Sequence, residues 1–211
     1  MALIEAFSSV DTVVIWVLLP LLRMLTVLLL ALRKRAGWLV LLVEPAGALV
    51  WMAASGGFSF AFLLLPAVAM YGWWRWGKRA ADGFPAVHSA QREDWLAAAA
   101  FVVLTVVVDC IQTLPMMMMH MTGVSVIVQT LLVNALTMLL YFGLARGVVE
   151  AWWLGIVLSL MGLTNAIATP GSAGPGVIWL LEGLTMTVLS GLLYLFGWFR
   201  WRAARAQTTV S

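Results

Sequence analysis

The sequence predicts an all-α membrane protein whose seven transmembrane helices form two parallel copies of a three-helix unit, joined by one further helix (a 3+1+3 layout). Three observations predict this fold class: the apolar composition, the placing of the basic residues, and a short string that occurs twice. Of the 211 residues, 64% are hydrophobic and 10% are charged, and the mean hydropathy is +1.02. Soluble domains are far more polar than this.

Runs of about 18 or more mostly apolar residues are long enough to cross a bilayer as helices. We expect seven spans, at about residues 13–32, 37–54, 58–76, 95–111, 123–145, 148–167 and 176–200. The first three spans form repeat one (about 10–76), the fourth is a linker helix (about 95–111), and the last three form repeat two (about 123–201). Residues 1–211 would then form a single transmembrane domain.

The basic residues test this number of spans. All of the 12 Lys and Arg residues except Arg23 follow spans one, three, five or seven, and these four places face one side of a seven-span chain. By the positive-inside rule that side is the cytoplasm, so the N-terminus is outside and the C-terminus is cytoplasmic. We expect a multi-pass protein of the cell (inner) membrane. The net charge of +3 then reflects topology and gives no reason to expect a nucleic-acid partner.

A string that occurs twice supports the duplication. The sequence YGWWRW at 71–76 ends span three, and FGWFRW at 196–201, 125 residues later, ends span seven. Trp38 and Trp153 correspond at an offset of 115 residues. An interfacial aromatic belt would explain tryptophans beside arginines, although it would not explain why the same order occurs twice. Because one helix lies between the triplets, both copies cross in the same direction, as in transporters with parallel repeats around a central site.

With ARGVVEAWW at 145–153, these features resemble the nicotinamide riboside transporter family, PnuC, over most of the chain. The resemblance implies a facilitator, not an enzyme, for uptake of a small ring-bearing vitamin or nucleoside. Nicotinamide riboside is the first expectation, with riboflavin or thiamine as alternatives from relatives in the family. It also implies that a cytoplasmic kinase traps the product, and it implies no cofactor. The chain departs from the family pattern at Thr130, Gly155 and Ser159, which are pocket-type positions.

Span five carries a polar stripe that is a candidate substrate site. Thr130, Asn134, Thr137 and Tyr141 step by four, three and four residues, which places them on one face of a helix. Polar groups inside a membrane face the protein interior or a water-filled path. The stripe suits a hydroxyl-rich ligand, and an amide such as Asn134 can donate and accept hydrogen bonds. The alternative is hydrogen bonding between helices.

Span six offers a second candidate surface. Trp152, Gly155, Ser159 and Gly162 share one face, where an indole beside small residues leaves room for a flat ring to stack. The alternative is close helix packing through the small residues, with Trp152 as a lipid-facing anchor.

Span two, which corresponds to span six in the first repeat, carries the matching residues Glu44, Gly47 and Trp51. Of these, Glu44 and Trp51 are candidate substrate contacts. Arg23 and Glu44 each lie about ten residues from the outer end of their span, or about 15 Å deep at 1.5 Å per residue. An unpaired charge at that depth is costly, so we expect an ion pair, unless Glu44 binds the substrate.

Other classes of protein fit the sequence less well. The Met-rich segment 116–121 contains His120, and thioethers and imidazoles bind copper, yet the chain has no second Met/His cluster. We therefore expect flexible apolar packing there and no metal site. A retinal protein needs a lysine in its last span, whereas Lys34 and Lys78 fall in expected loops. A non-transporting membrane scaffold is the remaining alternative, and the sequence leaves a homo-oligomer open.

Overall fold

A computed structural model describes the backbone of residues 18–55, 61–78, 87–118, 124–168 and 177–208. Side chains are described in these ranges outside residues 19, 44, 47–62, 112–127, 165–183 and 207–208.

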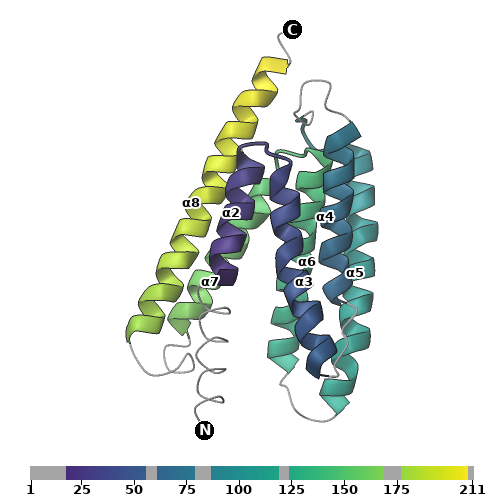
Figure 1. Cartoon of the computed structure of the whole chain (residues 1–211), viewed down its shortest axis with the longest axis vertical. Coiled ribbons are helices and arrows are strands. Elements are labelled where there is room, and N and C mark those ends of the chain that lie inside the picture. Colours follow the sequence, from purple (N-terminus) through teal and green to yellow (C-terminus); the bar gives the residue numbers. More distant parts are fainter. Residues whose placement is uncertain (1–17, 56–60, 79–86, 119–123, 169–176, 209–211) are drawn as a thin grey trace.

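Seven helices make up the described chain (Figure 1). They are α2 (Leu19–Ala31), α3 (Ala36–Ser55), α4 (Ala61–Lys78), α5 (Arg92–Met118), α6 (Val124–Arg146), α7 (Ala151–Ala168) and α8 (Val177–Thr208). The expected all-helical class is therefore confirmed for the described residues. Two helices are longer than expected. α5 continues about seven residues past 111, so part of the Met-rich segment is helical, and α8 continues to Thr208.

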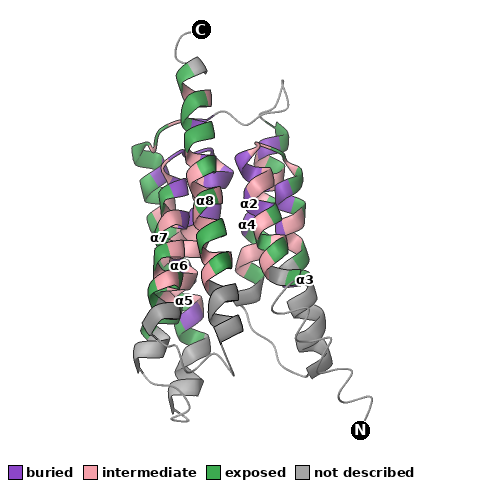
Figure 2. Cartoon of the chain, turned by 90° about the vertical axis from the view of Figure 1, so that its left-hand side faces the viewer, coloured by how far each residue is buried: buried purple, intermediate pink, exposed green. Residues whose placement is uncertain are grey.

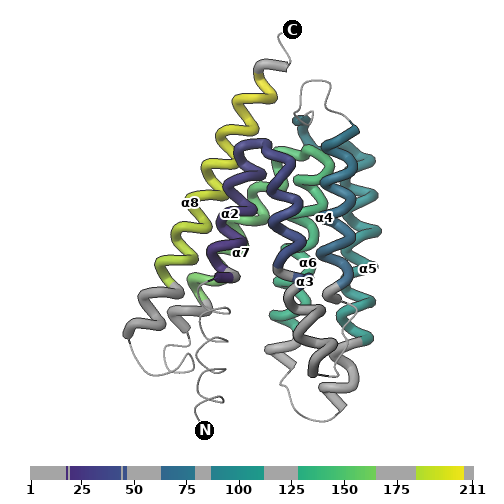
Figure 3. The backbone as a smooth tube through the Cα atoms, in the orientation of Figure 1, coloured from purple at the N-terminus to yellow at the C-terminus, as the bar shows by residue number. Residues whose placement is uncertain are grey.

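Six of the helices pack as a closed ring. α2 packs against α3, α3 against α4, α4 against α6, α6 against α7, α7 against α8, and α8 against α2. α5 is attached to this ring through α6 and, more weakly, through α4. In Figure 3, α8, α2 and α7 lie on one side of the molecule, and α3, α4, α6 and α5 lie on the other. The ring encloses a central region that helices from both halves of the chain surround.

The surface of the helices is strongly apolar. Val103 and Ile111 on α5 are 62% and 64% exposed, and Leu160 on α7 and Leu192 on α8 are each 56% exposed. Soluble monomers rarely expose large contiguous apolar patches, whereas a bilayer solvates them favourably.

Two described helical stretches are long and apolar enough to cross a membrane, Arg92–Ile111 and Val128–Arg146. Pro20–Ala31 and Ala151–Thr164 are shorter apolar helices. Together with the apolar surface, these stretches indicate that the protein lies in a membrane.

α2 and α6 end in the same type of turn. Arg33 follows α2 with φ 59° and Gly147 follows α6 with φ 86°, both in the left-handed region. At each turn, two N–H groups bond back to carbonyls three and five residues earlier, over 2.7–3.0 Å (Arg33 to Leu30, Lys34 to Leu29, Gly147 to Leu144, Val148 to Gly143). This pattern is the Schellman motif, which satisfies carbonyls that the end of a helix would leave unpaired. The chain thus reverses in the same way at both places.

The buried side chains concentrate toward one end of the described molecule (Figure 2). The described basic residues other than Arg23 lie on turns or helix ends at this end, which we call the arginine end: Arg33, Lys34, Arg35, Arg75, Lys78, Arg92, Arg146, Arg200, Arg202 and Arg205.

Candidate functional site

Four buried tryptophans cross the ring at the arginine end. Trp38 and Trp76 come from α3 and α4, Trp152 and Trp201 come from α7 and α8, and all are at most 2% exposed. The indole centroids are 5.3 Å apart for Trp38 and Trp76, 5.9 Å for Trp76 and Trp201, and 5.4 Å for Trp152 and Trp201. The two outer contacts are edge-to-face, at 89° and 81°. We call this row the tryptophan floor. It connects the first half of the ring, made of α2, α3 and α4, to the second half, made of α6, α7 and α8.

Two hydrogen bonds tie the floor to the opposite half in a reciprocal way. The Trp76 indole Nε1 on α4 donates to the Leu144 carbonyl of α6 over 3.3 Å. The Trp201 indole Nε1 on α8 donates to the Leu30 carbonyl of α2 over 3.1 Å. Both carbonyls belong to the turns described above, where each also accepts a bond from a turn N–H, that of Gly147 for Leu144 and that of Arg33 for Leu30. Each half of the chain therefore closes against the turn of the other half.

Glycines allow the floor to pack. A Cβ on Gly72 would lie 2.5 Å from the Trp38 ring, and a Cβ on Gly197 would lie 2.5 Å from the Trp152 ring. Since an indole is rigid, neither ring could give way without moving its helix. The repeated strings thus encode the same contact in both halves, a glycine against the preceding tryptophan and a final tryptophan in the floor.

In its contacts, Trp38 resembles Trp152. It does not resemble Trp153, which the offset of 115 residues predicted as its counterpart. Trp38 and Trp152 each cover a glycine and meet a neighbouring tryptophan edge-on. Trp153 is 47% exposed and contacts Trp198 at a tilt of 60°, with ring centroids 5.3 Å apart. Trp38 and Trp152 lie 114 positions apart in the sequence, as Leu30 and Leu144 do. Trp153 belongs to the exposed aromatic surface, together with Trp74.

Among the described residues, the indole nitrogens of Trp38 and Trp152 are buried without a hydrogen-bond partner. A buried N–H without a partner costs about 1–3 kcal/mol. Both tryptophans lie in the first turn of their helix, Trp38 in α3 and Trp152 in α7. A ligand or a different conformation of the ring could supply an acceptor.

A polar group lies beside the floor, about one to two helical turns from it. Tyr194 precedes Trp201 by seven residues, or about 10 Å at 1.5 Å per residue, and Tyr141 precedes Leu144 by three. The side chains of Tyr194 and Tyr141 are hydrogen-bonded. Because α7 lies between α6 and α8 in the ring, this bond from α8 to α6 lies on the inner side of the ring. We call Tyr141 and Tyr194 the inner wall.

Gly155 makes room for the inner wall. A Cβ at Gly155 would overlap the Tyr194 ring. Tyr194 also contacts Trp152, with centroids 6.3 Å apart. The space beside Gly155 is therefore occupied by a tyrosine ring from α8.

The structure places the predicted stripe of span five on α6 with mixed surroundings. Asn134 Nδ2 donates to Asp109 Oδ2 on α5 over 3.2 Å, and Asp109 is buried. The Thr137 hydroxyl donates to the Val133 carbonyl within the same helix over 2.8 Å. Thr130 is exposed and Tyr141 is buried. Of the four, Tyr141 joins the inner wall, while Asn134 connects α6 to α5.

The predicted residues of span six separate as well. Trp152 is fully buried in the floor, so a ligand ring could stack on it only after Tyr194 or Trp201 moved. Ser159 lines an apolar groove of about 200 Å³ between α7 and α8, beside Thr187 and Gly191. The side chains of Glu44 and Trp51 lie outside the described residues, so the Arg23–Glu44 pair remains a prediction.

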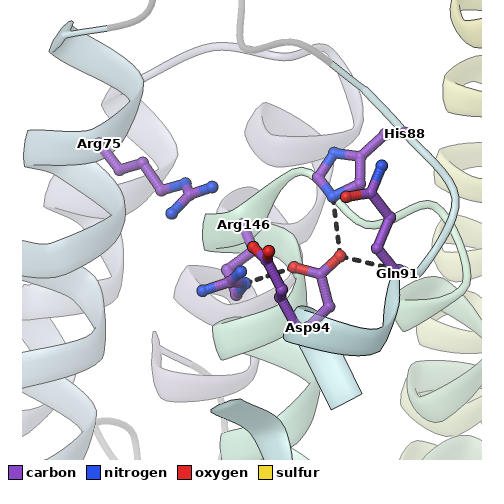
Figure 4. A pocket seen from close by; sticks show the side chains of 6 residues that line it. Arg75, His88, Gln91, Asp94 and Arg146 are labelled. Carbon is purple, nitrogen blue, oxygen red and sulfur yellow. Dashed lines mark hydrogen bonds and ion pairs between the residues drawn. The ribbon is translucent and has the colours of Figure 1, made fainter. Parts of the chain in front are cut away.

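A cavity of about 380 Å³ opens at the arginine end (Figure 4). Its lining includes Arg75, His88, Gln91, Asp94 and Arg146. Asp94 is 6% exposed and accepts hydrogen bonds from Arg146 Nε, from His88 Nε2 at 3.0 Å and from the Gln91 N–H at 3.0 Å. The last bond caps α5, because a carboxylate at the third helical position reaches back to the N-cap residue. Asp94 therefore joins the start of α5 to the end of α6.

The segment before α5 is also bonded to the turn between α6 and α7. His88 forms an isolated parallel bridge with Val148, through bonds of 3.0 Å to the Gly147 carbonyl and 3.1 Å from the Val149 N–H. The Ala90 N–H donates to Glu150 over 3.0 Å. These bonds attach α5 to the second half of the ring. The sequence predicted no site role for His88, Asp94 or Glu150, because their importance depends on contacts between distant segments.

Comparisons with known proteins give one structural match. A crystal structure described as the vitamin B3 transporter PnuC superposes with a TM-score of 0.55, covering 96% of this chain and 88% of that chain at 14% sequence identity. No protein-family model matches the chain, and no curated protein matches its sequence. The expected likeness to PnuC is thus confirmed at the level of the fold.

Proposed function

We propose that this protein is a membrane transporter that passes a small ring-bearing vitamin or nucleoside through the ring of six helices by facilitated diffusion. The tryptophan floor carries the proposal. Four buried indoles, two from each half, cross the ring at one end and bond to the opposite half through Trp76 and Trp201. A transporter needs such a closure, made between two bodies that can separate, and the likeness to the PnuC fold supports it.

The proposal includes a parallel 3+1+3 repeat, with α2, α3 and α4 matching α6, α7 and α8, and α5 joining them. Three features support it: the matching turns after α2 and α6, the matching glycine contacts, and the reciprocal indole bonds. In this arrangement the arginine end faces the cytoplasm and the N-terminus lies outside. The floor then closes the cytoplasmic side, and the substrate enters from the other side.

Only a few weak interactions have to break for the floor to open. Each indole–carbonyl bond contributes about 0.5–1.5 kcal/mol net, and the edge-to-face ring contacts add about 0.5–1.5 kcal/mol each. These energies are small enough for a ligand that favours one state to shift the equilibrium. The two halves separate at the floor while the α2–α8 and α4–α6 contacts rotate past each other.

Nicotinamide riboside is the first substrate to test, with riboflavin and thiamine as alternatives. Uptake of each labelled compound should be measured in transport-deficient cells that express the protein. We expect saturable uptake of at least one compound, which continues when the proton gradient is abolished. If none of the three accumulates although the protein is in the membrane, the proposed function is wrong. Loss of accumulation on deleting the matching cytoplasmic kinase would support trapping of the product.

The predicted site residues are tested by binding to purified protein. We expect Asn134→Ala and Trp152→Ala to lower affinity about 5- to 150-fold, because loss of a buried partner costs about 1–3 kcal/mol. Asp109→Ala is the matched control for Asn134, since the two side chains bond to each other. An equal loss in Asp109→Ala would assign Asn134 a structural role, and unchanged affinity in both site variants would place the site elsewhere.

The proposed orientation has its own test. Cysteines placed singly at the N-terminus and at Ser211 of a Cys110→Ser background should be labelled from outside and from inside, respectively. Labelling of the N-terminal cysteine only from the cytoplasm would reverse the topology.

A further inference from the structure

We infer that the cavity at the arginine end is a binding site for a phosphate monoester, held between Arg75 of α4 and Arg146 of α6. None of the described residues of the tryptophan floor or the inner wall lines this cavity, so the inference goes beyond the proposed function. The volume of about 380 Å³ is in the range of sites for small molecules. The described lining consists of polar and charged side chains, which favours a charged ligand.

The two arginines are placed beside each other by a stacked pair of rings. Tyr71 of α4 and Phe142 of α6 stack at 13°, with centroids 5.8 Å apart. Each ring is followed four residues later by an arginine, Arg75 or Arg146, whose guanidinium carbon lies 5.9 Å from the ring centroid. Figure 4 shows the Arg75 side chain extending across the cavity toward Arg146. Each half of the ring therefore contributes one guanidinium to the cavity.

These guanidiniums have donors left for a ligand. A guanidinium carries five N–H donors. Among the described residues, Arg75 donates to the Tyr71 hydroxyl over 2.8 Å and forms no ion pair. Arg146 uses its Nε on Asp94. The remaining N–H groups suit the oxygens of a phosphate, which arginine can bind through two parallel hydrogen bonds.

The charge around the cavity also favours an anion. The buried Asp94 carboxylate is already neutralised, because its oxygens accept bonds from Arg146, His88 and the Gln91 N–H. Glu93 lines the cavity too, although it is exposed. The described part of the arginine end carries ten Lys and Arg residues against three acidic residues, Glu93, Asp94 and Glu150. Such an excess of positive charge attracts anions to the cavity.

A phosphate in this cavity would bridge the two halves of the ring. The halves meet where α4 packs against α6 and where α8 packs against α2. A phosphate that bonds to both Arg75 and Arg146 stabilises the state in which α4 and α6 are held together. A ligand that binds only the folded protein raises its thermal unfolding midpoint by mass action. We therefore expect binding and thermal stabilisation together.

Ribose 5-phosphate is the probe, and ribose is the ligand control. Binding is measured by calorimetry on the full chain in phosphatidylcholine nanodiscs, at physiological ionic strength so that scattered surface charges are screened. We expect ribose 5-phosphate to bind at least about tenfold more tightly than ribose, a difference of about 1.4 kcal/mol. It should also raise the unfolding midpoint of the wild type.

Three variants test the role of Arg75. Arg75→Gln should lower the affinity for ribose 5-phosphate about tenfold, because the charge-assisted bonds are lost. Glu93→Gln should raise the affinity about threefold, because a like charge is removed from beside the phosphate. Lys78→Gln is the matched control: it removes one charge from the same end of α4, on an exposed side chain that does not line the cavity, and should change the affinity less than about twofold.

A phosphate monoester reaches this cavity either on a soluble compound or on the headgroup of phosphatidic acid, and nanodiscs that contain phosphatidic acid distinguish the two. Unchanged affinity for ribose 5-phosphate in these nanodiscs assigns the site to a soluble compound. Weaker binding there, with a raised unfolding midpoint that Arg75→Gln abolishes, assigns it to a lipid headgroup.

Two results would overturn the inference. One is an equal loss of affinity in Arg75→Gln and Lys78→Gln, which would show attraction to the general charge of this end. The other is binding of ribose 5-phosphate no tighter than that of ribose, without stabilisation by phosphatidic acid. Should Arg75→Gln not fold, Arg75→Lys, expected to bind more weakly than the wild type, and Glu93→Gln decide the question. Because binding is measured without transport, its failure leaves the proposed function standing, and a failure of vitamin uptake leaves the phosphate site standing.

Discussion

The tryptophan floor and the inner wall are neighbours in the ring but differ in how they are built. The floor has two matched halves, in which Gly72 and Gly197 contact equivalent indoles and Trp76 and Trp201 bond to equivalent carbonyls. The inner wall has no such match, because Tyr194 corresponds to Ala69. A closure between two bodies works best when both sides are alike, while recognition of an asymmetric ligand needs an asymmetric surface.

The largest expected effect tests whether the floor halves are equivalent. Gly72→Leu and Gly197→Leu should each destabilise the protein by about 3 kcal/mol or more. The new side chain would overlap a rigid indole ring, that of Trp38 or that of Trp152. Thermal unfolding in detergent would measure both. Gly77→Ala is the control: its Cβ would meet the flexible end of Arg35, which can move away. If one leucine variant were as stable as the wild type, the two halves would not be equivalent.

A second test concerns the connection of α5 to the ring. Asp94→Asn should cost about 1.5–3 kcal/mol, because a buried carboxylate loses its charge-assisted bonds to Arg146 and His88. Glu93→Gln, one residue earlier and exposed, should have little effect. Both can be compared by thermal unfolding at neutral pH. Equal stability of the two variants would mean that the Asp94 cluster does not hold α5 in place.

Loss of an indole donor should have a similar but smaller effect in both halves. Trp76→Phe and Trp201→Phe each remove an indole donor while the Leu144 and Leu30 carbonyls keep their bonds from the turn N–H groups, so each should cost about 0.5–1.5 kcal/mol. The exposed Trp74→Phe is the matched control from the same string. Transport assays should show that the two floor variants raise exchange across the membrane more than Trp74→Phe does. A change confined to one of the two would contradict a closure shared equally by the halves.

The smallest effect distinguishes the two turns, which share a geometry but not a residue type. Gly147→Ala should destabilise by about 1 kcal/mol, because a side chain at φ 86° is strained. Arg33→Gly, at φ 59°, should relieve a similar strain, offset by the loss of the Arg33 side-chain contacts. The thermal unfolding midpoints of the Gly147→Ala and Arg33→Gly variants, each compared with that of the wild type, measure the two effects. An equal shift of the same sign in both variants would show that backbone strain does not control the stability of these turns.

The sequence by itself determined the helical class, the approximate positions of the spans and the concentration of charge at one end. These properties depend on local composition and on the length of apolar runs, which a single stretch of chain displays. The repeated strings also pointed to equivalent helices. They could not decide between Trp152 and Trp153, because successive side chains on a helix point about 100° apart and both residues are tryptophan.

Only the tertiary structure decided which residues meet. Asn134 stands on the predicted polar stripe, yet its amide bonds to Asp109 on α5. Tyr194, which the sequence did not single out, joins the inner wall from α8. The Trp76 and Trp201 bonds join residues 68 and 171 positions apart. Such contacts depend on the register between helices that pack side by side, and local periodicity carries no information about that register.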